Sequence, residues 1–419
     1  MFERHTTPRL LAALRTRPVV LVNGPRQAGK STLARWIAEG PHQATYVTFD
    51  DAVTLAAARN DPGGFLDART GNLVLDEVQK VTDLFPAIKL RVDRDRRPGR
   101  FLLTGSADVL LLPNLSESLA GRVEIHTLWP LSQGEIEGVR EGFIDAVFGE
   151  GALPLDIEPE PWPSLVERIV RGGYPEVVGG PKGLDREEWF RAYVTTILQR
   201  EIRSISEVAG LTALPDLLMV LAARATGLVN YAELSRSTTL PQTTLKRYMA
   251  LLRLIFIVET LPAWLVNTSQ RLIKSPKLLL TDTGLLTHLR GHAAESLLTR
   301  RDLVGPLLET FVAAELRKQA GWSRTRPALH HFRTTEGREV DIVLEARTGR
   351  LVGIEVTASA TPGAADFKSL ALLAEVAGKR FHRGILLYTG TQAVPFGENL
   401  FALPVSALWR VASEQARAA

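Results

Sequence analysis

The stretch VVLVNGPRQAGKSTLARWIAEG, residues 19–40, decides the fold of this chain. Four of its residues match every fixed position of the pattern G-x-x-x-x-G-K-[ST], namely Gly24, Gly29, Lys30 and Ser31. The apolar run before the pattern predicts a short buried strand, and the run after it predicts a helix that ends at Gly40. A glycine loop between a strand and a helix surrounds phosphate groups with backbone N–H groups. We therefore predict a nucleotide site in residues 24–32.

The parts of this loop have separate expected roles. We expect the following residues to bind the nucleotide: Gly24, Pro25, Arg26, Gln27, Ala28, Gly29, Lys30, Ser31 and Thr32. Lys30 is expected to reach the β- and γ-phosphates of ATP, and the Ser31 hydroxyl is expected to bind Mg²⁺. In the helix that follows, the spacing predicts that Leu33, Trp36 and Ile37 share one face. The alternative, a glycine turn without a ligand, is disfavoured by the strand and helix signals around it.

A pair of acids ends a second apolar run, NLVLDEVQ at residues 72–79. Asp76 at the end of this strand is expected to bind Mg²⁺, and Glu77 beside it to activate the attacking water as a general base. A strand followed by two acids is also typical of a solvated turn. The nucleotide loop earlier in the chain favours the catalytic interpretation.

Two further segments carry candidate residues for ATP hydrolysis. Thr104 and Ser106 end the run RFLLTGS, where they could orient the water or sense the γ-phosphate, although an ordinary strand-end turn is the alternative. Arg122 directly precedes a predicted strand at residues 123–128. An arginine at this place could stabilise transition-state charge on a nucleotide held by a neighbouring subunit. A surface arginine at a helix end is the alternative.

The apolar runs predict a doubly wound α/β fold. Five strands are expected, at residues 19–23, 45–49, 73–75, 101–104 and 123–128. Helical patterns lie between them, so we expect a parallel sheet with right-handed crossovers.

The motifs GPRQAGKST, LVLDEVQK, FLLTGSAD and SLAGRVEI together resemble those of the AAA+ ATPases. More closely, the chain resembles a bacterial and archaeal ATP-binding family in which an AAA domain is fused to a C-terminal domain of unknown function. The likeness continues through RGGYPEVV, KSPKLLLTDTGLL and GREVDIVLE, and so it spans nearly the whole chain. It implies an ATPase core with the roles given above, with Thr104 at the sensor 1 position and Arg122 at the arginine-finger position. It also implies a homo-oligomer.

Changes in composition predict four parts in the chain. We expect an AAA+ P-loop ATPase core at 1–140, a linker and helical lid at 141–210, a winged helix-turn-helix at 211–270, and a PD-(D/E)XK-like, restriction-endonuclease-like α/β domain at 271–419. Residues 141–165 are rich in Pro, Gly and acids, which is typical of a loop. The sequence GGYPE at 172–176 either approaches the nucleotide as part of the lid or ends a helix.

The winged unit is predicted from three helical segments and a strand within residues 214–261. The helix that begins at Pro241 has Thr243, Thr244, Lys246 and Arg247 on its polar face. These residues could contact DNA if the helix enters a major groove. Packing within the protein or against another protein is the alternative, because only two of these residues are cations.

Strand and helix signals alternate in the last third of the chain. Glu309 lies on a predicted helix, and Asp341 and Glu355 lie on two predicted strands, an arrangement that resembles the PD-(D/E)XK nucleases. Paired carboxylates of this kind can hold Mg²⁺ and activate water. Two residues after Glu355, however, where the nucleases have lysine, this chain has Thr357, and Lys368 is a candidate replacement. We interpret these acids as a possible vestigial nuclease site in a shell that still binds nucleic acid or a protein.

The overall composition limits the kind of protein. Of the 419 residues, 45% are hydrophobic and 23% charged, as in soluble globular proteins. We expect neither a membrane span nor a signal peptide, because no long apolar run is present. The absence of cysteine excludes disulfides and thiolate zinc sites, and fits the cytoplasm. The net charge of +4 permits contact with nucleic acid but does not require it.

Three functions remain open at this point. The first is an AAA+ ATPase that hydrolyses ATP with Mg²⁺ and couples this reaction to DNA binding or remodelling. The second is a regulatory ATPase switch that controls a protein partner without DNA. The third, an active ATP-dependent nuclease, is weakened by Thr357.

Overall fold

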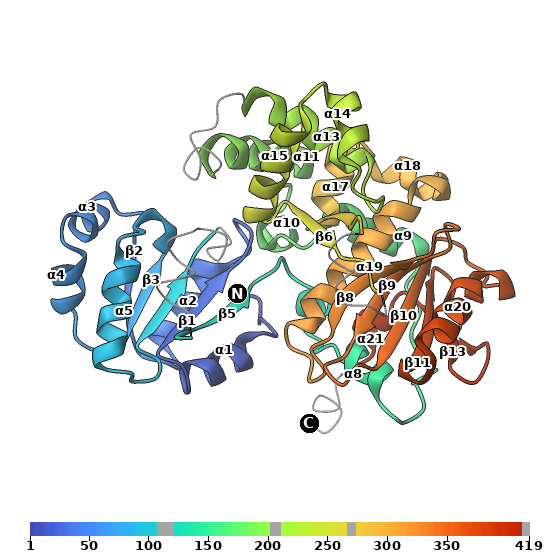
Figure 1. Ribbon diagram of the computed structural model, residues 1–419, viewed down its shortest axis with the longest axis horizontal. Helices are drawn as coiled ribbons and strands as arrows, with labels where there is room; N and C mark the ends of the chain where they lie inside the picture. The colour runs from blue at the N-terminus through green and yellow to red at the C-terminus, as the bar shows by residue number, and fades with distance from the viewer. Residues whose placement is uncertain (107–120, 202–210, 266–273, 413–419) are drawn as a thin grey trace. The chain divides into compact units, whose positions relative to one another are not determined.

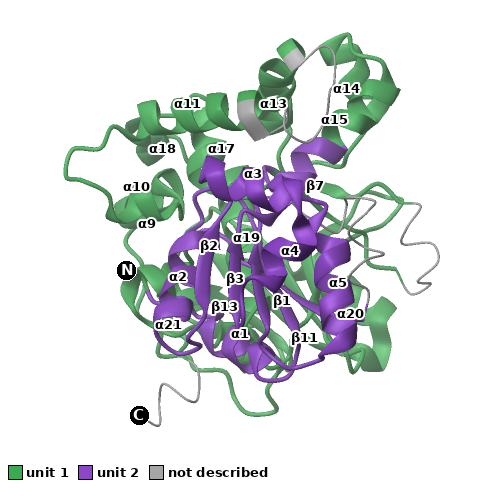
Figure 2. Ribbon diagram, turned by 90° about the vertical axis from the view of Figure 1, so that its left-hand side faces the viewer, with its two compact units in different colours: residues 1–2, 131–249, 258–419 green, residues 3–130, 250–257 purple. Residues whose placement is uncertain are grey.

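The structure is a computed structural model that describes residues 1–106, 121–201, 211–265 and 274–412 (Figure 1). It divides into two compact units (Figure 2). We call residues 3–130 and 250–257 the sheet unit, and residues 1–2, 131–249 and 258–419 the large unit. The domain boundaries at 140, 210 and 270 stay predictions.

The sheet unit contains five parallel strands in the order β2-β3-β4-β1-β5. Its strands are β1 (Val19–Asn23), β2 (Thr45–Thr48), β3 (Leu73–Asp76), β4 (Phe101–Thr104) and β5 (Val123–Thr127). Its helices are α1 (Thr7–Leu14), α2 (Lys30–Glu39), α3 (Ala52–Asn60), α4 (Pro62–Asp67) and α5 (Leu84–Arg94), with a 3₁₀ turn at Val78–Lys80. The five predicted strands and the α/β class are confirmed.

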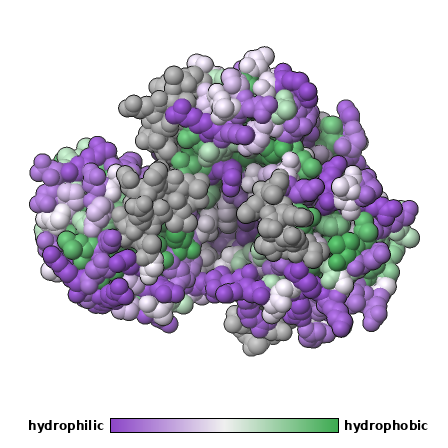
Figure 3. Space-filling view, in the orientation of Figure 1, coloured by the Kyte–Doolittle hydropathy of each residue, from purple (hydrophilic) through white to green (hydrophobic). Residues whose placement is uncertain are grey.

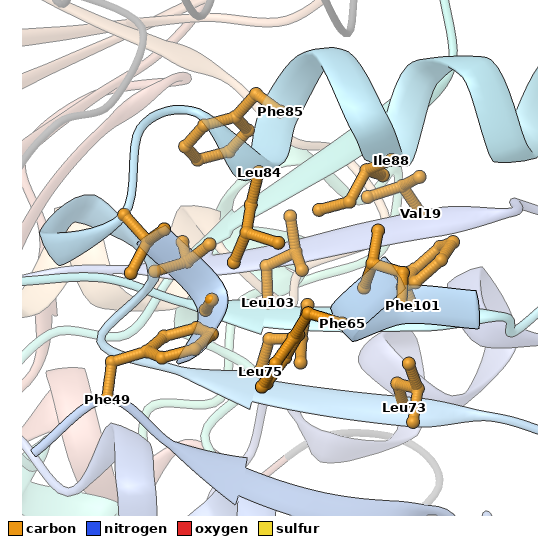
Figure 4. Packing of buried hydrophobic residues seen from close by; sticks show 14 of the residues in the cluster. Val19, Phe49, Phe65, Leu73, Leu75, Leu84, Phe85, Ile88, Phe101 and Leu103 are labelled. Atoms are coloured by element: carbon orange, nitrogen blue, oxygen red, sulfur yellow. The ribbon is translucent and has the colours of Figure 1, made fainter. Parts of the chain in front are cut away.

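Both faces of this sheet are covered by apolar side chains. On one face, Val19, Leu73 and Phe101 pack with side chains of α3, α4 and α5 (Figure 4). On the other face, the alternate strand residues, such as Val20 and Leu102, pack with α1 and α2. A strand buried on both faces has no polar alternation, which explains its continuous apolar sequence.

The helix after the glycine loop differs in one respect from the expectation. It ends at Glu39 with Gly40 as its C-cap, as predicted, but Trp36 is 44% exposed. The buried face of α2 instead combines Leu33 and Ile37 with two alanines. Residues of a helix share a face at spacings of three and four, and the small alanines allow α2 to lie close to the sheet.

The large unit contains a second, mixed sheet of order β12-β13-β11-β10-β9-β8. Its strands are β8 (Ala328–Arg333), β9 (Glu339–Glu345), β10 (Leu351–Thr357), β11 (Phe381–Tyr388), β12 (Val394–Pro395) and β13 (Leu400–Pro404). β10 pairs in parallel with β11 and antiparallel with β9. Trp264, Leu370 and Leu386 belong to the core on one side of it. The separate C-terminal α/β sheet is therefore confirmed.

Helices make up most of the rest of the large unit. Those before residue 258 are α7 (Gln133–Glu137), α8 (Phe143–Phe148), α9 (Trp162–Arg171), α10 (Pro175–Gly179), α11 (Arg186–Thr196), α13 (Leu214–Ala223), α14 (Tyr231–Thr238) and α15 (Gln242–Leu254), with a π-helical turn at Ile197–Glu201 and a 3₁₀ turn at Leu211–Ala213. Residues 250–254 of α15 belong to the sheet unit. The two-stranded antiparallel sheet β6 (Val258–Leu261) and β7 (Lys277–Leu280) follows. The later helices are α17 (Thr283–Leu289), α18 (Ala294–Thr299), α19 (Gly305–Ala320), α20 (Lys368–Ala377) and α21 (Ala407–Arg410), with 3₁₀ turns at Arg301–Leu303, Ala364–Phe367 and Gly378–Arg380.

Two segments of the expected linker and lid have a definite structure. Within the loop-like stretch, residues 143–148 form α8, whose Phe143, Ile144 and Val147 are buried. In GGYPE, Gly172 is the C-cap of α9, and the Gly173 N–H donates to Asp282 Oδ2 at 2.7 Å. Because a Cβ on Gly172 would lie 2.3 Å from Asp282 Oδ1, only glycine fits there. The sequence therefore ends a helix, one of the two predicted alternatives. Residues 202–210 of the expected lid lie outside the described residues.

Among the described residues, no helix is both long enough and apolar enough to cross a membrane. The face shown in Figure 3 is largely hydrophilic, with smaller hydrophobic areas between the polar side chains.

Candidate functional site

The glycine loop has the backbone of a phosphate cradle. Gly24 has φ +140°, and a Cβ on it would lie 2.3 Å from the Leu128 carbonyl oxygen. Gly29 has φ +93° and directly precedes the first residue of α2. These two glycines allow the loop to turn tightly between β1 and the N-terminus of α2.

Lys30 lies inside this loop. Its side chain is 4% exposed, and its ammonium group donates to the Gly24 carbonyl at 2.9 Å and to the Pro25 carbonyl at 2.7 Å. The predicted phosphate-binding cation is thus held at the centre of the cradle. The other loop residues surround it: Pro25 and Ala28 are buried, Arg26 is half-buried, and Gln27 and Thr32 are exposed.

Arg4 contacts this loop from outside it, and the sequence analysis missed this contact. Its guanidinium donates to the Ala28 carbonyl at 2.7 Å and to the Trp129 carbonyl at 2.6 Å. It therefore connects the glycine loop to the chain after β5. No local pattern identifies this contact, because the partners are 24 and 125 residues away.

Asp76 is the centre of a hydrogen-bond network at the carboxyl edge of the sheet. It is 2% exposed and accepts from Ser31 Oγ at 2.9 Å, from Thr104 Oγ1, and from Tyr46 OH at 2.7 Å. Burial and the neighbouring Asp76 raise the pKa of Tyr46 above its ordinary range, so the phenol stays a donor. Ser31, Asp76 and Thr104 were predicted, whereas Tyr46 was missed.

Glu77 lies beside this network on a strained backbone. It has φ +59°, and its N–H donates to Thr104 Oγ1 at 3.1 Å. Gln79 donates to the Glu77 carboxylate and, at 2.9 Å, to Ser106 Oγ. The structure therefore brings together the predicted Glu77, Thr104 and Ser106, and adds Gln79.

Arg122 lies at the opposite edge of the sheet from these residues. It immediately precedes β5, whereas the glycine loop and Asp76 lie at the carboxyl ends of β1 and β3. Strands advance about 3.3 Å per residue, so the five residues of β5 separate the two edges. Its guanidinium forms two hydrogen bonds with Asp93, at 2.6 and 2.9 Å. The structure thus does not place Arg122 at the nucleotide loop of its own chain. Residues 118–120 of its motif lie outside the described residues.

A second group of acids lies in the large unit. The carboxylates of Glu309, Glu339 and Asp341 surround the ammonium group of Lys277. Lys277 Nζ is 2.6 Å from Glu309 Oε1 and 3.2 Å from Asp341 Oδ1, and it also pairs with Glu339. The Val356 N–H donates to Asp341 Oδ2 at 3.0 Å. We call the side chains of Lys277, Glu309, Glu339, Asp341 and Glu355 the carboxylate centre.

Burial controls the charges in the carboxylate centre. It raises the pKa of Glu309 and that of Glu355, with a further contribution from the charge of Asp341, whereas the neighbouring Lys277 ammonium acts in the opposite direction on both. Burial alone would lower the pKa of Lys277, but the charges of Glu309, Asp341 and Glu339 outweigh it and raise this pKa. The ammonium group therefore stays charged.

The structure brings together the three predicted acids of this centre. The lysine that pairs with them is Lys277, whereas the predicted replacement was Lys368. Lys368 is exposed at the first turn of α20, because the buried Leu370 and Leu373 turn the other side of that helix inward. Lys368 as the replacement was therefore wrong. Lys277 was missed because it precedes the acids by more than thirty residues, outside any motif spacing.

Three segments of the chain match known protein families. Residues 16–137 match the AAA domain family, residues 163–296 match a domain of unknown function (DUF8612), and residues 304–408 match another (DUF4143). The uncharacterized proteins Rv2008c of Mycobacterium tuberculosis and Mb2031c of Mycobacterium bovis are each 32% identical to the chain over 405 residues. These residues cover 96% of this chain and 83% of each relative.

Two solved structures are similar over part of the chain. A point variant of RuvB from Thermotoga maritima has 18% identity and a TM-score of 0.29, and covers 61% of this chain and 89% of its own. AMPPCP-bound DnaA of Aquifex aeolicus has 12% identity and a TM-score of 0.27, and covers 59% of this chain and 85% of its own.

The glycine loop, the paired acids and the five-stranded parallel sheet define a P-loop ATPase of the AAA+ class. The chain belongs to the AAA+ family whose ATPase domain is followed by a C-terminal domain of unknown function, and it shares this family with the two mycobacterial proteins.

Proposed function

We propose that the protein binds ATP with Mg²⁺ and that Glu77 activates the water that hydrolyses it. The observation that carries this proposal is the convergence of Ser31 and Thr104 on Asp76, directly beside Glu77. A hydroxyl and a carboxylate oxygen 2.9 Å apart are oxygen ligands of the kind that Mg²⁺ prefers. The left-handed backbone at Gly29 (φ +93°), directly before the N-terminus of α2, supports a phosphate beside them.

Each residue has a defined task in this reaction. Lys30 and the N-terminus of α2 would bind the phosphates, while Ser31 and Asp76 would hold Mg²⁺. When bound, Mg²⁺ would neutralise charge on the β- and γ-phosphates. Glu77 accepts a proton from the attacking water while the oxygen of that water bonds to the γ-phosphorus. ADP leaves with the electrons of the broken P–O bond.

We propose further that Arg122 acts on the nucleotide of a neighbouring copy of the chain. Its place at the far edge of the sheet from its own glycine loop supports a role in trans rather than in cis. The two hydrogen bonds with Asp93 would hold the guanidinium in place. The protein would then be a homo-oligomer with the site shared between copies.

The client of the ATPase is proposed to be DNA. The order α13, α14, α15, β6 and β7 is that of a winged helix, and β6 and β7 pair antiparallel as a wing does. On α15, Lys246 and Arg247 are exposed, and Lys246 Nζ lies 5.7 Å from the centre of the Tyr231 ring. Two exposed cations on the third helix of such a unit favour phosphate contacts.

The test is the rate of ATP hydrolysis by the purified full chain, with and without duplex or single-stranded DNA and RNA. Stimulation by DNA, with binding that weakens steeply as salt rises, supports the DNA-coupled ATPase. An unchanged rate across all nucleic acids would instead favour the regulatory switch that acts on a protein partner. Absence of ATP hydrolysis under every condition would contradict the proposed reaction itself. The cytoplasmic location stays a prediction.

A further inference from the structure

The carboxylate centre holds an ammonium group among acids whose oxygens are suited to a metal ion. Among the described residues, Glu309, Glu339 and Asp341 offer ligand oxygens that all lie within 4.8 Å of one another. Lys277 Nζ bonds to the same three carboxylates. The lysine side chain is 1% exposed, so its charged end lies inside the protein.

The hydrogen bonds of this ammonium group are complete. A lysine ammonium has three N–H donors, and Lys277 has one carboxylate partner for each of them. Its distances of 2.6 and 3.2 Å are hydrogen-bond distances, longer than the 2.0–2.1 Å at which Mg²⁺ binds oxygen. A metal ion among these oxygens would therefore have to displace the ammonium group.

The backbone makes this displacement unfavourable. Lys277 is the first residue of β7, where it pairs with Leu261 of β6 and forms a bridge with Leu228. These contacts hold the start of the side chain, and displacement would separate the ammonium from its three carboxylate partners. Removing one partner of a buried ion pair is costly, because it leaves an uncompensated charge.

We propose that Lys277 replaces the metal ion of the carboxylate centre, and that the centre is a metal-free ion-pair cluster that fastens β7 to α19 and β9. The lysine comes from the segment that matches DUF8612, and the acids come from the segment that matches DUF4143. The cluster thus joins the proposed wing to the C-terminal sheet. The carboxylate centre is a different site from the proposed ATP site, so an experiment can overturn the proposal for one site and leave the other standing.

The test uses Mn²⁺ as the probe, added to the full-length protein without nucleotide and followed by electron paramagnetic resonance. The first comparison is between the wild type and Asp341→Asn. We expect the same number of bound Mn²⁺ ions in both, because any weak binding at the ATPase loop is common to them. If the wild type binds a Mn²⁺ ion that Asp341→Asn loses, the proposal is overturned.

The second comparison removes the ammonium group from the carboxylate centre. Lys277→Met removes the charge but keeps the length of the side chain, and we expect it to bind one more Mn²⁺ ion per chain than the wild type. Adding Asp341→Asn to Lys277→Met should remove this extra ion. A folded Lys277→Met variant that gains no Mn²⁺ ion would overturn the idea that the ammonium takes the metal's place. If Lys277→Met does not fold, Lys277→Gln serves the same comparison, and the wild type against Asp341→Asn still decides.

Discussion

Ser31 Oγ donates a hydrogen bond of 2.9 Å to Asp76 Oδ1, which joins the first turn of α2 to the end of β3. The two residues are 45 positions apart, and they meet at one edge of the sheet, where β3 ends at Asp76 and Ser31 is the second residue of α2. This bond places the two proposed Mg²⁺ ligands side by side, next to Lys30 at the start of α2.

Lys30→Ala should abolish detectable ATP binding. The substitution removes a buried cation from the centre of the phosphate cradle, and hydrogen bonds to charged groups contribute about 1.5–3 kcal/mol each. Isothermal titration calorimetry with a non-hydrolysable ATP analogue measures the loss. Arg15→Ala, an exposed cation of the same unit, is the matched control and should keep wild-type affinity. Equal affinity in Lys30→Ala would contradict the assignment of the cradle.

Glu77→Gln should keep ATP bound and lower kcat by about 10²–10⁴-fold, because an amide cannot accept the proton of water. Gln79→Ala should lower kcat less, since it removes only a donor that orients Glu77. Single-turnover hydrolysis and nucleotide binding, measured on both variants, separate these effects. Normal turnover in Glu77→Gln would exclude it as the base.

Arg122→Ala should leave ATP affinity unchanged and reduce hydrolysis by about 10³-fold in the assembled protein. The rate per chain of the wild type should also rise with protein concentration as subunits assemble. Asp93→Asn keeps the arginine and removes only its charged partner, so it should retain most of the activity. Full wild-type activity in a protein that sediments as a monomer would contradict the role in trans.

Replacing both Lys246 and Arg247 by alanine should weaken DNA binding about equally for all sequences. If each contacts one phosphate, the slope of log K against log salt should fall by about 2. Fluorescence anisotropy of labelled duplex DNA at several salt concentrations measures this slope. The control is Lys182→Ala combined with Lys379→Ala, two exposed lysines outside the winged unit. A slope that changes no more than in the control would remove this helix from the DNA contact.

His331 should make the large unit less stable in mild acid. Burial lowers the pKa of His331 to about 4, against about 6.5 for an exposed histidine. Below pH 6.5 the unfolded chain therefore takes up a proton that the folded chain does not. The free energy of unfolding falls as the pH drops from 6.5 to 4, by about 3 kcal/mol from this group, and stays constant with respect to it above pH 6.5.

The measurement for His331 is urea unfolding followed by tryptophan fluorescence, since Trp264 is buried and its backbone N–H donates to the His331 carbonyl. His331→Gln should be less stable than the wild type near pH 7, and this difference should shrink as the pH falls to 4. A difference that does not change with pH would show that His331 contributes only through packing.

The sequence by itself determined the parallel sheet, the nucleotide loop and the residues at the strand ends. The reason is that these features are local: an apolar run long enough for a buried strand, two glycines at fixed spacing, and acids or hydroxyls directly after a strand. In a parallel sheet the carboxyl ends meet at one edge, so the positions of Ser31, Asp76 and Thr104 in the sequence predict that they converge.

Only the tertiary structure decided which other side chains complete these sites. Arg4 and Tyr46 reach the nucleotide loop and Asp76 from distant segments, and Lys277 enters the carboxylate centre from a different strand pair than its acids. Trp36 is exposed although the helical spacing favoured its burial. Such contacts depend on how separate elements pack, and a pairing across tens or hundreds of residues leaves no periodic signal in one sequence.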